Sequence, residues 1–156
     1  MTDLAAIREV EQVFVTYFDR VDAKDPEGAA AVFAEDARID IMTGRVVEGR
    51  DAYARTLAAV LGQYGRTSHH VSNFQVTVDG DRAQLMAHVD AVHRMKSDGR
   101  IWQLWARIVD VLERRDGEWT VVEHTLHGVD SEPPWDAIPD DWYPGHPDRP
   151  FADTAS

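Results

Sequence analysis

Four of the seven histidines lie within residues 67–94, and their side chains are suited to acid–base chemistry. They are His69, His70, His88 and His93. An imidazole titrates close to neutral pH, so a histidine that faces an apolar pocket can take a proton from carbon. The same four residues can instead bind a metal or lie on a solvated sheet face. The faces of the strands that carry them decide among these possibilities.

Strand periodicity distributes these histidines over two faces. The stretch reads as two strands joined by an Asp-Gly turn, and each strand alternates apolar and polar residues. The alternation predicts that His70 and His93 face inward and that His69 and His88 point away, which argues against a metal site. An ideal ladder separates His70 from His93 by about 13 Å, so a bulge or strong curvature is needed for both to touch one ligand.

A carboxylate near the end of the first predicted helix is a candidate partner for a histidine. Asp22 lies where the helix dipole disfavours a negative charge, so we expect a cationic or hydrogen-bonding partner for it. Tyr17 lies on the apolar stripe of the same helix. It is either a core aromatic or a phenol that donates to a substrate oxygen.

Helical and strand periodicities define the elements that carry these residues. Helices are predicted at 3–23, after Asp25-Pro26 through Phe33, and at about 50–62, and strands at 37–42, 67–78, 82–95, 101–113 and 118–127. Helices come first and a meander of long strands follows. This order predicts an α+β fold in which helices pack on one face of a curved sheet.

The last hairpin sets the faces of the two final strands. A turn at Asp116-Gly117 pairs Asp110 with Glu123, and like charges opposite each other are expected on a solvated face. This pairing predicts that Trp105, Arg107 and His124 face inward. The same pairing places an apolar patch on the outer face, made of Trp102, Leu104, Ile108 and Leu112. Such a patch on a sheet face predicts a homo-oligomer, either a trimer or a dimer.

Composition narrows the class of protein. The 156 residues have the size of one domain, with a net charge of -12 and no cysteine. Scattered basic residues argue against nucleic acid as a partner, and the lack of cysteine excludes disulfides and thiolate sites. Neither a signal peptide nor a membrane span is visible, so we expect a cytoplasmic protein without a membrane partner. A tail at 131–156 is rich in proline and carries aromatics expected to dock: Trp135, Trp142, Tyr143 and Phe151.

Several segments resemble the SnoaL-like branch of the nuclear transport factor 2 superfamily. They are "TYFDRVDAKD", "AVFAEDARIDI", "HHVSNFQVTVDGDRAQ" and "RRDGEWTVVEH". The resemblance runs from about residue 5 to 127 and implies a domain at 1–130, followed by the tail. The implied fold is a cone, a strongly curved antiparallel sheet wrapped around three N-terminal helices, with a deep apolar pocket.

The resemblance also implies a site. The scytalone dehydratase and bile-acid 7α-dehydratase branch pairs an Asp near the end of helix one with a His at the start of a long strand, and Asp22 and His70 stand at the matching positions. Tyr17 keeps the spacing of a family tyrosine. His93 matches a polar residue on the next strand and is expected to protonate a departing hydroxide or to hold a water.

The implied function is that of a cofactor-independent lyase or isomerase, such as a dehydratase, which uses an Asp-His dyad. Its substrate is a hydrophobic oxygenated small molecule such as a steroid, polyketide or terpenoid. The alternatives are a non-catalytic small-molecule-binding or assembly protein and a polyketide-cyclase-type enzyme. No metal or cofactor is expected. The residues expected to contact substrate are Phe14, Phe33, Tyr53, Val89, Trp105, Arg107 and His124.

Overall fold

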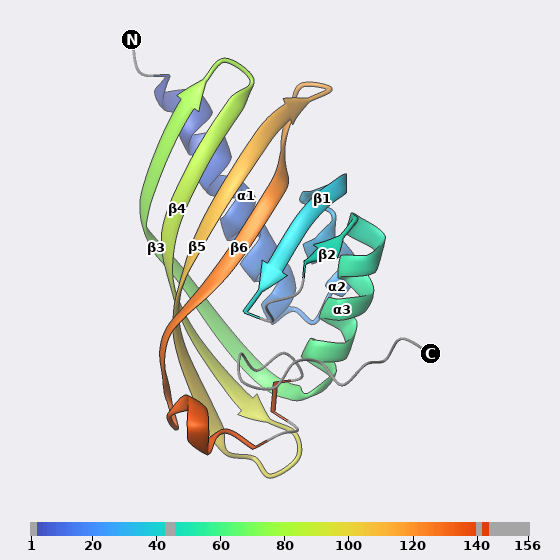
Figure 1. The fold of residues 1–156 in the computed structure, drawn as a ribbon, viewed down its shortest axis with the longest axis vertical. Helices are drawn as coiled ribbons and strands as arrows, with labels where there is room; N and C mark the ends of the chain where they lie inside the picture. The colour runs from blue at the N-terminus through green and yellow to red at the C-terminus, as the bar shows by residue number, and fades with distance from the viewer. Residues whose placement is uncertain (1–2, 43–45, 140–141, 144–156) are drawn as a thin grey trace.

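The fold combines three helices with one six-stranded sheet (Figure 1). The computed structural model describes residues 3–42, 46–139 and 142–143. The elements are α1 Leu4–Asp22, α2 Pro26–Ala30, β1 Phe33–Ile41, β2 Val47–Glu48, α3 Arg50–Gly62, β3 Tyr64–Asp79, β4 Arg82–Met95, β5 Ile101–Arg115, β6 Glu118–Glu132 and the short 3-10 helix Trp135–Ala137. The predicted α+β class is confirmed.

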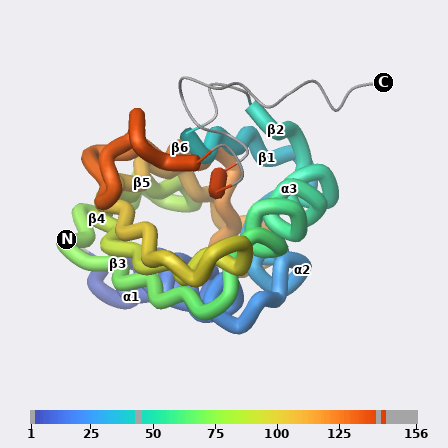
Figure 2. Tube along the Cα trace, turned by 90° about the horizontal axis from the view of Figure 1, so that it is seen from below, coloured from blue at the N-terminus to red at the C-terminus, as the bar shows by residue number. Residues whose placement is uncertain are grey.

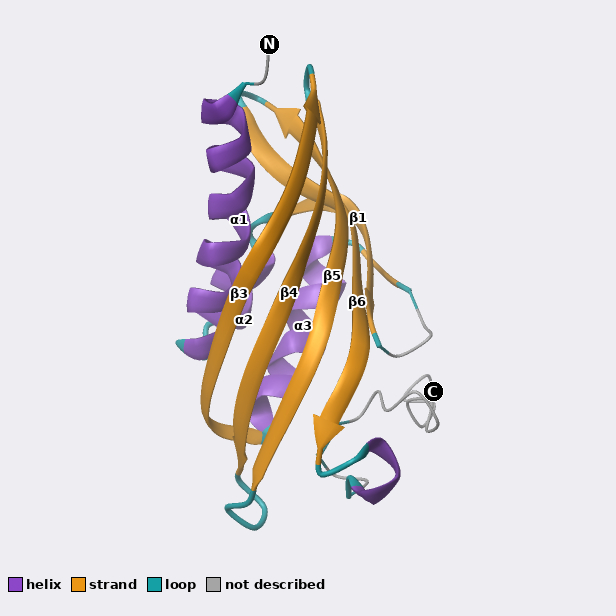
Figure 3. Cartoon of the chain, turned by 90° about the vertical axis from the view of Figure 1, so that its left-hand side faces the viewer, coloured by secondary structure: helices purple, strands orange, loops and turns teal. Residues whose placement is uncertain are grey.

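The helices lie together on one side of the sheet (Figure 3). The Asp3 side chain caps α1 by accepting from the backbone N–H of Ala6 at 3.0 Å, and the helix buries its apolar stripe. That stripe, which includes Val10, Phe14 and Tyr17, faces the sheet, so the polar face of α1 remains in water. None of the helices in the described ranges is long and apolar enough to cross a membrane.

The sheet is mixed and strongly curved. Its strand order is β2-β1-β6-β5-β4-β3, and the four long strands form the predicted antiparallel meander. The pair β1–β6 is parallel, which makes the otherwise antiparallel sheet mixed. No hairpin joins these two strands, and their relative direction is therefore not fixed by a turn. Seen from below, the meander curves toward the helices, which cover its inner face (Figure 2).

A β-bulge in β3 reverses the alternation of its side chains. Ser72 pairs with His88 but Gln75 pairs with Met86, so β3 carries one extra residue at this point. Asn73 lies within the bulge at φ 54°, a left-handed conformation that asparagine tolerates better than most residues. Beyond the bulge the even residues face inward, as predicted, whereas before it the odd residues do.

A second bulge, in β6, explains the wrong assignment of β5. Leu112 pairs with Val121 as predicted, but Val111 pairs with Glu123, which leaves Val122 as the extra residue. From Val111 to Ala106 the pairs are shifted by one residue relative to a regular ladder, and a second irregularity before Trp105 adds one more. The predicted inner and outer faces of β5 are consequently exchanged.

The predicted outer patch therefore belongs to the core. Trp102, Ile108 and Leu112 are fully buried, and Leu104 is nearly so. The argument for an oligomer from these residues is wrong, because they pack on the inner face. The large apolar residues that the sheet exposes on its strands are Ile101, Trp105, Val109 and Val129.

The first part of the predicted tail closes the lower end of the fold. Ile138, Trp142 and Tyr143 are buried. The guanidinium of Arg100 lies 4.6 Å from the centre of a Trp142 ring, and the Tyr143 hydroxyl donates a hydrogen bond to the carbonyl oxygen of Ile41. The docking of these two aromatics was predicted, whereas Phe151 lies outside the described residues.

Candidate active site

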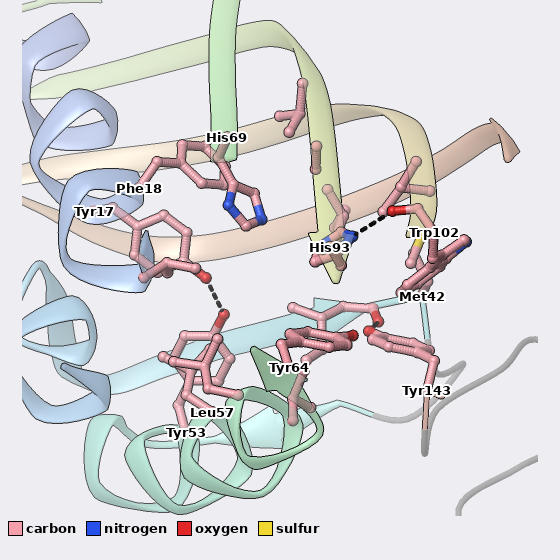
Figure 4. Close-up of a pocket in the computed structure, with 18 residues that line it drawn as sticks. Tyr17, Phe18, Met42, Tyr53, Leu57, Tyr64, His69, His93, Trp102 and Tyr143 are labelled. Carbon is pink, nitrogen blue, oxygen red and sulfur yellow. Dashed lines mark hydrogen bonds between the residues drawn. The ribbon is translucent and has the colours of Figure 1, made fainter. Parts of the chain in front are cut away.

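A small apolar cavity lies between helices α1 and α3 and the inner face of the long strands (Figure 4). Its volume is about 70 Å³, which is enough for a few water molecules. Most of the lining is aliphatic or aromatic carbon. Four tyrosines and two histidines also line it: Tyr17, Tyr53, Tyr64, Tyr143, His69 and His93.

Asp22 and His69 form a hydrogen-bonded pair at this cavity. Asp22 is the last residue of α1, and its Oδ1 lies 2.7 Å from Nδ1 of His69. The His69 backbone N–H donates to Oδ2 at 2.9 Å, and the Thr67 hydroxyl donates to Oδ1 at 2.7 Å. Burial raises the pKa of Asp22, but the hydrogen bonds from His69 and Thr67 outweigh it and lower that pKa to about 2.

The His69 ring is held by its neighbours as well as by the carboxylate. Its side chain is 9% exposed, and the ring stacks on Phe18 at 5.3 Å. In the neutral ring, a carboxylate at Nδ1 favours the proton on that nitrogen, which leaves the lone pair on Nε2. His69 contributes to the lining of the cavity, as Figure 4 shows. An oriented base of this kind is the arrangement that proton abstraction requires.

His70 does not belong to the site. It is exposed and points to the other face of β3, so the prediction that it pairs with Asp22 is wrong. The cause is the bulge at Asn73, because the prediction from alternating residues assumed a regular strand without an extra residue. The available signal was Asn73 itself, a residue that tolerates positive φ, within an otherwise regular strand pattern.

His93 faces inward, as predicted, and is 3% exposed. Its ring stacks on Trp102 at 4.8 Å, and its Nδ1 lies 3.2 Å from the Trp102 carbonyl oxygen, to which it can only donate. Burial, with a smaller effect from nearby His69, lowers the pKa of His93 to about 3. His93 is therefore neutral at pH 7 and has an acceptor at Nε2. It is suited to hold a hydroxyl or a water, whereas the expected role as a proton donor requires an imidazolium that is scarcely populated.

Two of the four tyrosines that line the cavity form a hydrogen-bonded pair. The hydroxyls of Tyr17 and Tyr53 lie 2.6 Å apart and point toward each other (Figure 4). Burial raises the pKa of both phenols, so both remain protonated. One proton lies in their mutual hydrogen bond and the other is free to be donated to a third oxygen.

The other residues expected to contact substrate divide into three groups. Val89, like Tyr53, lines the cavity. Phe14 and Phe33 are buried behind Tyr17, with ring centroids 6.3 and 5.5 Å from its ring, and do not line it. Trp105 and Arg107 lie on the outer face of β5, so their predicted inward orientation is wrong because of the bulge in β6.

His124 belongs to a second Asp-His pair, deeper in the core. Its Nδ1 lies 2.5 Å from Oδ1 of Asp110, and both side chains are almost completely buried. The His124 ring packs near Tyr17 and Phe33. Burial raises the pKa of Asp110 in spite of the adjacent imidazole. Sequence reasoning missed this pair because it placed Asp110 opposite Glu123 on a solvated face. Over the described ranges, no group of three or more acidic or histidine side chains is arranged to hold a metal.

Comparisons with known proteins agree with this fold. A family model, the SnoaL-like domain, matches residues 2–125. An uncharacterized protein of Mycobacterium tuberculosis is 34% identical over 76 residues, 48% of this chain and 52% of that protein. A counterpart in Mycobacterium bovis matches equally. The chain therefore spans about half the length of the curated relatives it matches.

Solved structures show the same architecture. A protein assigned as a scytalone dehydratase, from Novosphingobium aromaticivorans, superimposes with a TM-score of 0.77 and 29% identity, covering 82% of this chain and 87% of that one. A hexachlorocyclohexane dehydrochlorinase from Novosphingobium barchaimii superimposes with a TM-score of 0.73 and 16% identity, covering 81% of this chain and 88% of that one. At this identity the similarity shows the fold alone. With the family model matching most of its length, this chain belongs to the SnoaL-like domain family.

Proposed function

We propose that the protein is a cofactor-independent lyase that removes water from a hydrophobic, oxygenated small molecule. The observation that carries the proposal is the Asp22–His69 pair, whose imidazole borders an apolar cavity. The similarity to a protein assigned as a scytalone dehydratase supports the same class of reaction. The best substrate class is a β-hydroxy ketone within a ring system, as found among steroids, polyketides and terpenoids.

The geometry supports a stepwise elimination. Nε2 of His69 takes the proton on the carbon next to the ketone, and the C–H electron pair becomes an enolate. The free O–H of the Tyr17–Tyr53 pair donates a hydrogen bond to the enolate oxygen and keeps its proton, and Asp22 stabilises the imidazolium. The enolate then collapses to a carbon–carbon double bond as the C–O bond breaks. His69 returns its proton to the departing hydroxide, which leaves as water, and Nε2 of His93 accepts a hydrogen bond from that group.

A non-catalytic binding or assembly protein is the second candidate, and the small cavity favours it. Pockets for drug-sized ligands measure roughly 300–1,000 Å³, whereas this one is about 70 Å³. A ring system enters only if part of the wall moves. Tyr143, which follows β6 in the chain, forms part of this wall.

The adjacent histidines provide a matched test. Cyclic β-hydroxy ketones are screened for the absorbance of the conjugated enone, and His69→Gln is compared with His70→Gln. We expect the first variant to lose at least about 100-fold in kcat and the second to retain parental activity. Equal activity of the two variants on a true substrate would refute the mechanism. Calorimetric binding without turnover by the parent protein would favour the second candidate.

A further inference from the structure

The residue after α1 that adopts a left-handed conformation is a lysine. The helix ends with hydrogen bonds from Ala23 N–H to Asp19 O and from Asp25 N–H to Arg20 O, both 3.0 Å, and Lys24 between them has φ 59°. Glycine is the usual residue at this position, because a side chain there costs roughly 1 kcal/mol or more. The chain has only two lysines, Lys24 and Lys96, among its 16 basic residues. The backbone conformation alone therefore does not explain why a lysine occupies this position.

The side chain of Lys24 begins a chain of hydrogen bonds that leads to Asp22. Its ammonium donates to Oγ1 of Thr67 at 2.6 Å, and the Thr67 hydroxyl donates to Oδ1 of Asp22 at 2.7 Å. An ammonium has no acceptor, so the single hydroxyl proton of Thr67 is left for the carboxylate. The direction of both hydrogen bonds is therefore fixed. The same Oδ1 faces Nδ1 of His69, which places Lys24 two hydrogen bonds from the dyad.

We propose that Lys24 is a positioning residue of the dyad, which holds the Asp22 carboxylate in place through Thr67 and brings a positive charge close to the Asp22–His69 pair. The inference rests on the proposed function, because it assigns a role in preparing the base. Asp22 alone would stabilise the imidazolium and so retain the proton that the base must be free to take. The positive charge of Lys24 offsets part of this effect.

The titratable groups around this chain of hydrogen bonds come from each neighbouring element. They are Asp22 on α1, His69 on β3, His93 on β4 and Lys96 in the turn after β4. Burial lowers the pKa of Lys24, with repulsion from Lys96 in the same direction and attraction to Asp22 opposing both. Lys96 is exposed, and its backbone N–H donates to Gln63 O at 3.0 Å. It offers the same charge nearby without the bond to Thr67, which makes it a matched control.

The test is an NMR titration of the His69 ring, which needs no substrate. We expect Lys24→Met to raise the titration midpoint by about half to one pH unit, Lys96→Met to raise it by clearly less, and Lys24→Arg to restore it. In a Thr67→Val background, Lys24→Met should shift the midpoint by less than half as much. Equal shifts from the two lysine variants, or an undiminished shift in the valine background, would overturn the inference.

Two further variants distinguish failure of the proposed function from failure of the role assigned to Lys24. Asp22→Asn must change the His69 midpoint if the dyad exists, and no change would reject the proposed function itself. If that variant responds and Lys24→Met does not, only the role of Lys24 fails. Lys24→Gly removes the ammonium while relieving the left-handed backbone. This variant should unfold at a urea concentration no lower than that of the parent, and its His69 titration midpoint should still be raised. A His69 titration midpoint equal to that of the parent would assign Lys24 a structural role alone.

Discussion

Burial of His93 makes the stability of this fold depend on pH in a defined direction. The pKa of His93 is lowered from 6.5 to about 3, chiefly by burial. Between these values the unfolded chain binds the proton and the folded chain does not. The contribution of His93 to the free energy of unfolding therefore rises with pH across this window, whereas the raised pKa of Asp110 acts in the opposite direction. The contribution is fully present above pH 6.5 and is lost as the pH falls toward 3.

The magnitude follows from the size of the shift. Each pH unit between the two values changes the free energy of unfolding by about 1.4 kcal/mol, so lowering the pH from 6.5 to 5 removes about 2 kcal/mol. The lowered pKa of Asp22, about 2, affects stability only below pH 3.8 and does not enter this range. The full contribution of His93, about 5 kcal/mol, is an upper limit, because local opening admits water to the protonated ring.

Urea unfolding at several pH values between 5 and 7.5 measures this dependence. His93→Phe keeps a ring against Trp102 but cannot titrate, so its unfolding free energy should fall less on acidification than that of the parent, by about 2 kcal/mol at pH 5. The exposed His70 provides the control, since His70→Gln should follow the parent curve. A His93→Phe variant with the same pH dependence as the parent would refute the reasoning.

Three other predictions follow from the site and its supports. Tyr17→Phe should lower kcat on an eliminated ketone by about 10- to 100-fold, measured by enone absorbance, with circular dichroism unchanged. Asn73→Gly should keep or raise the urea midpoint because its φ of 54° suits glycine, whereas Asn73→Val should lower the unfolding free energy by about 1–2 kcal/mol. Tyr143→Ala removes the hydroxyl bonded to Ile41 O and part of the cavity wall, so an apolar fluorescent dye should bind faster in stopped flow; an unchanged rate would locate the entrance elsewhere.

Much of the fold was predictable because the relevant signals are local. The apolar stripe of α1, the Asp-Pro start of α2 and the Asp116-Gly117 turn each act within a few residues, and the structure has them where the pattern placed them. The parallel pairing of β1 with β6 was not predictable in this way. It joins residues far apart in sequence, and no turn between them records the direction.

Side-chain faces were predictable only as far as the nearest bulge. On β4, which has no bulge in its pairing with β5, all inward residues including His93 are correct. On β5 the prediction failed because it was carried across the extra residue Val122 of its partner strand. The buried pair Asp110 and His124 lies just beyond that residue. Because this one residue was not counted, a buried hydrogen-bonded pair was predicted to be two like charges opposed on the surface.

The choice between His69 and His70 shows why residue types alone cannot identify the histidine that pairs with Asp22. An inward odd set brings Thr67 and His69 toward Asp22, and an inward even set would present Ser68 and His70. Both sets supply one hydroxyl and one imidazole in the same spacing, so the family pattern fits either one. The extra residue at the bulge selects the odd set, and the hydrogen bonds to Asp22 are formed by that set alone. The bulge that interrupts strand alternation thus also determines which histidine pairs with Asp22.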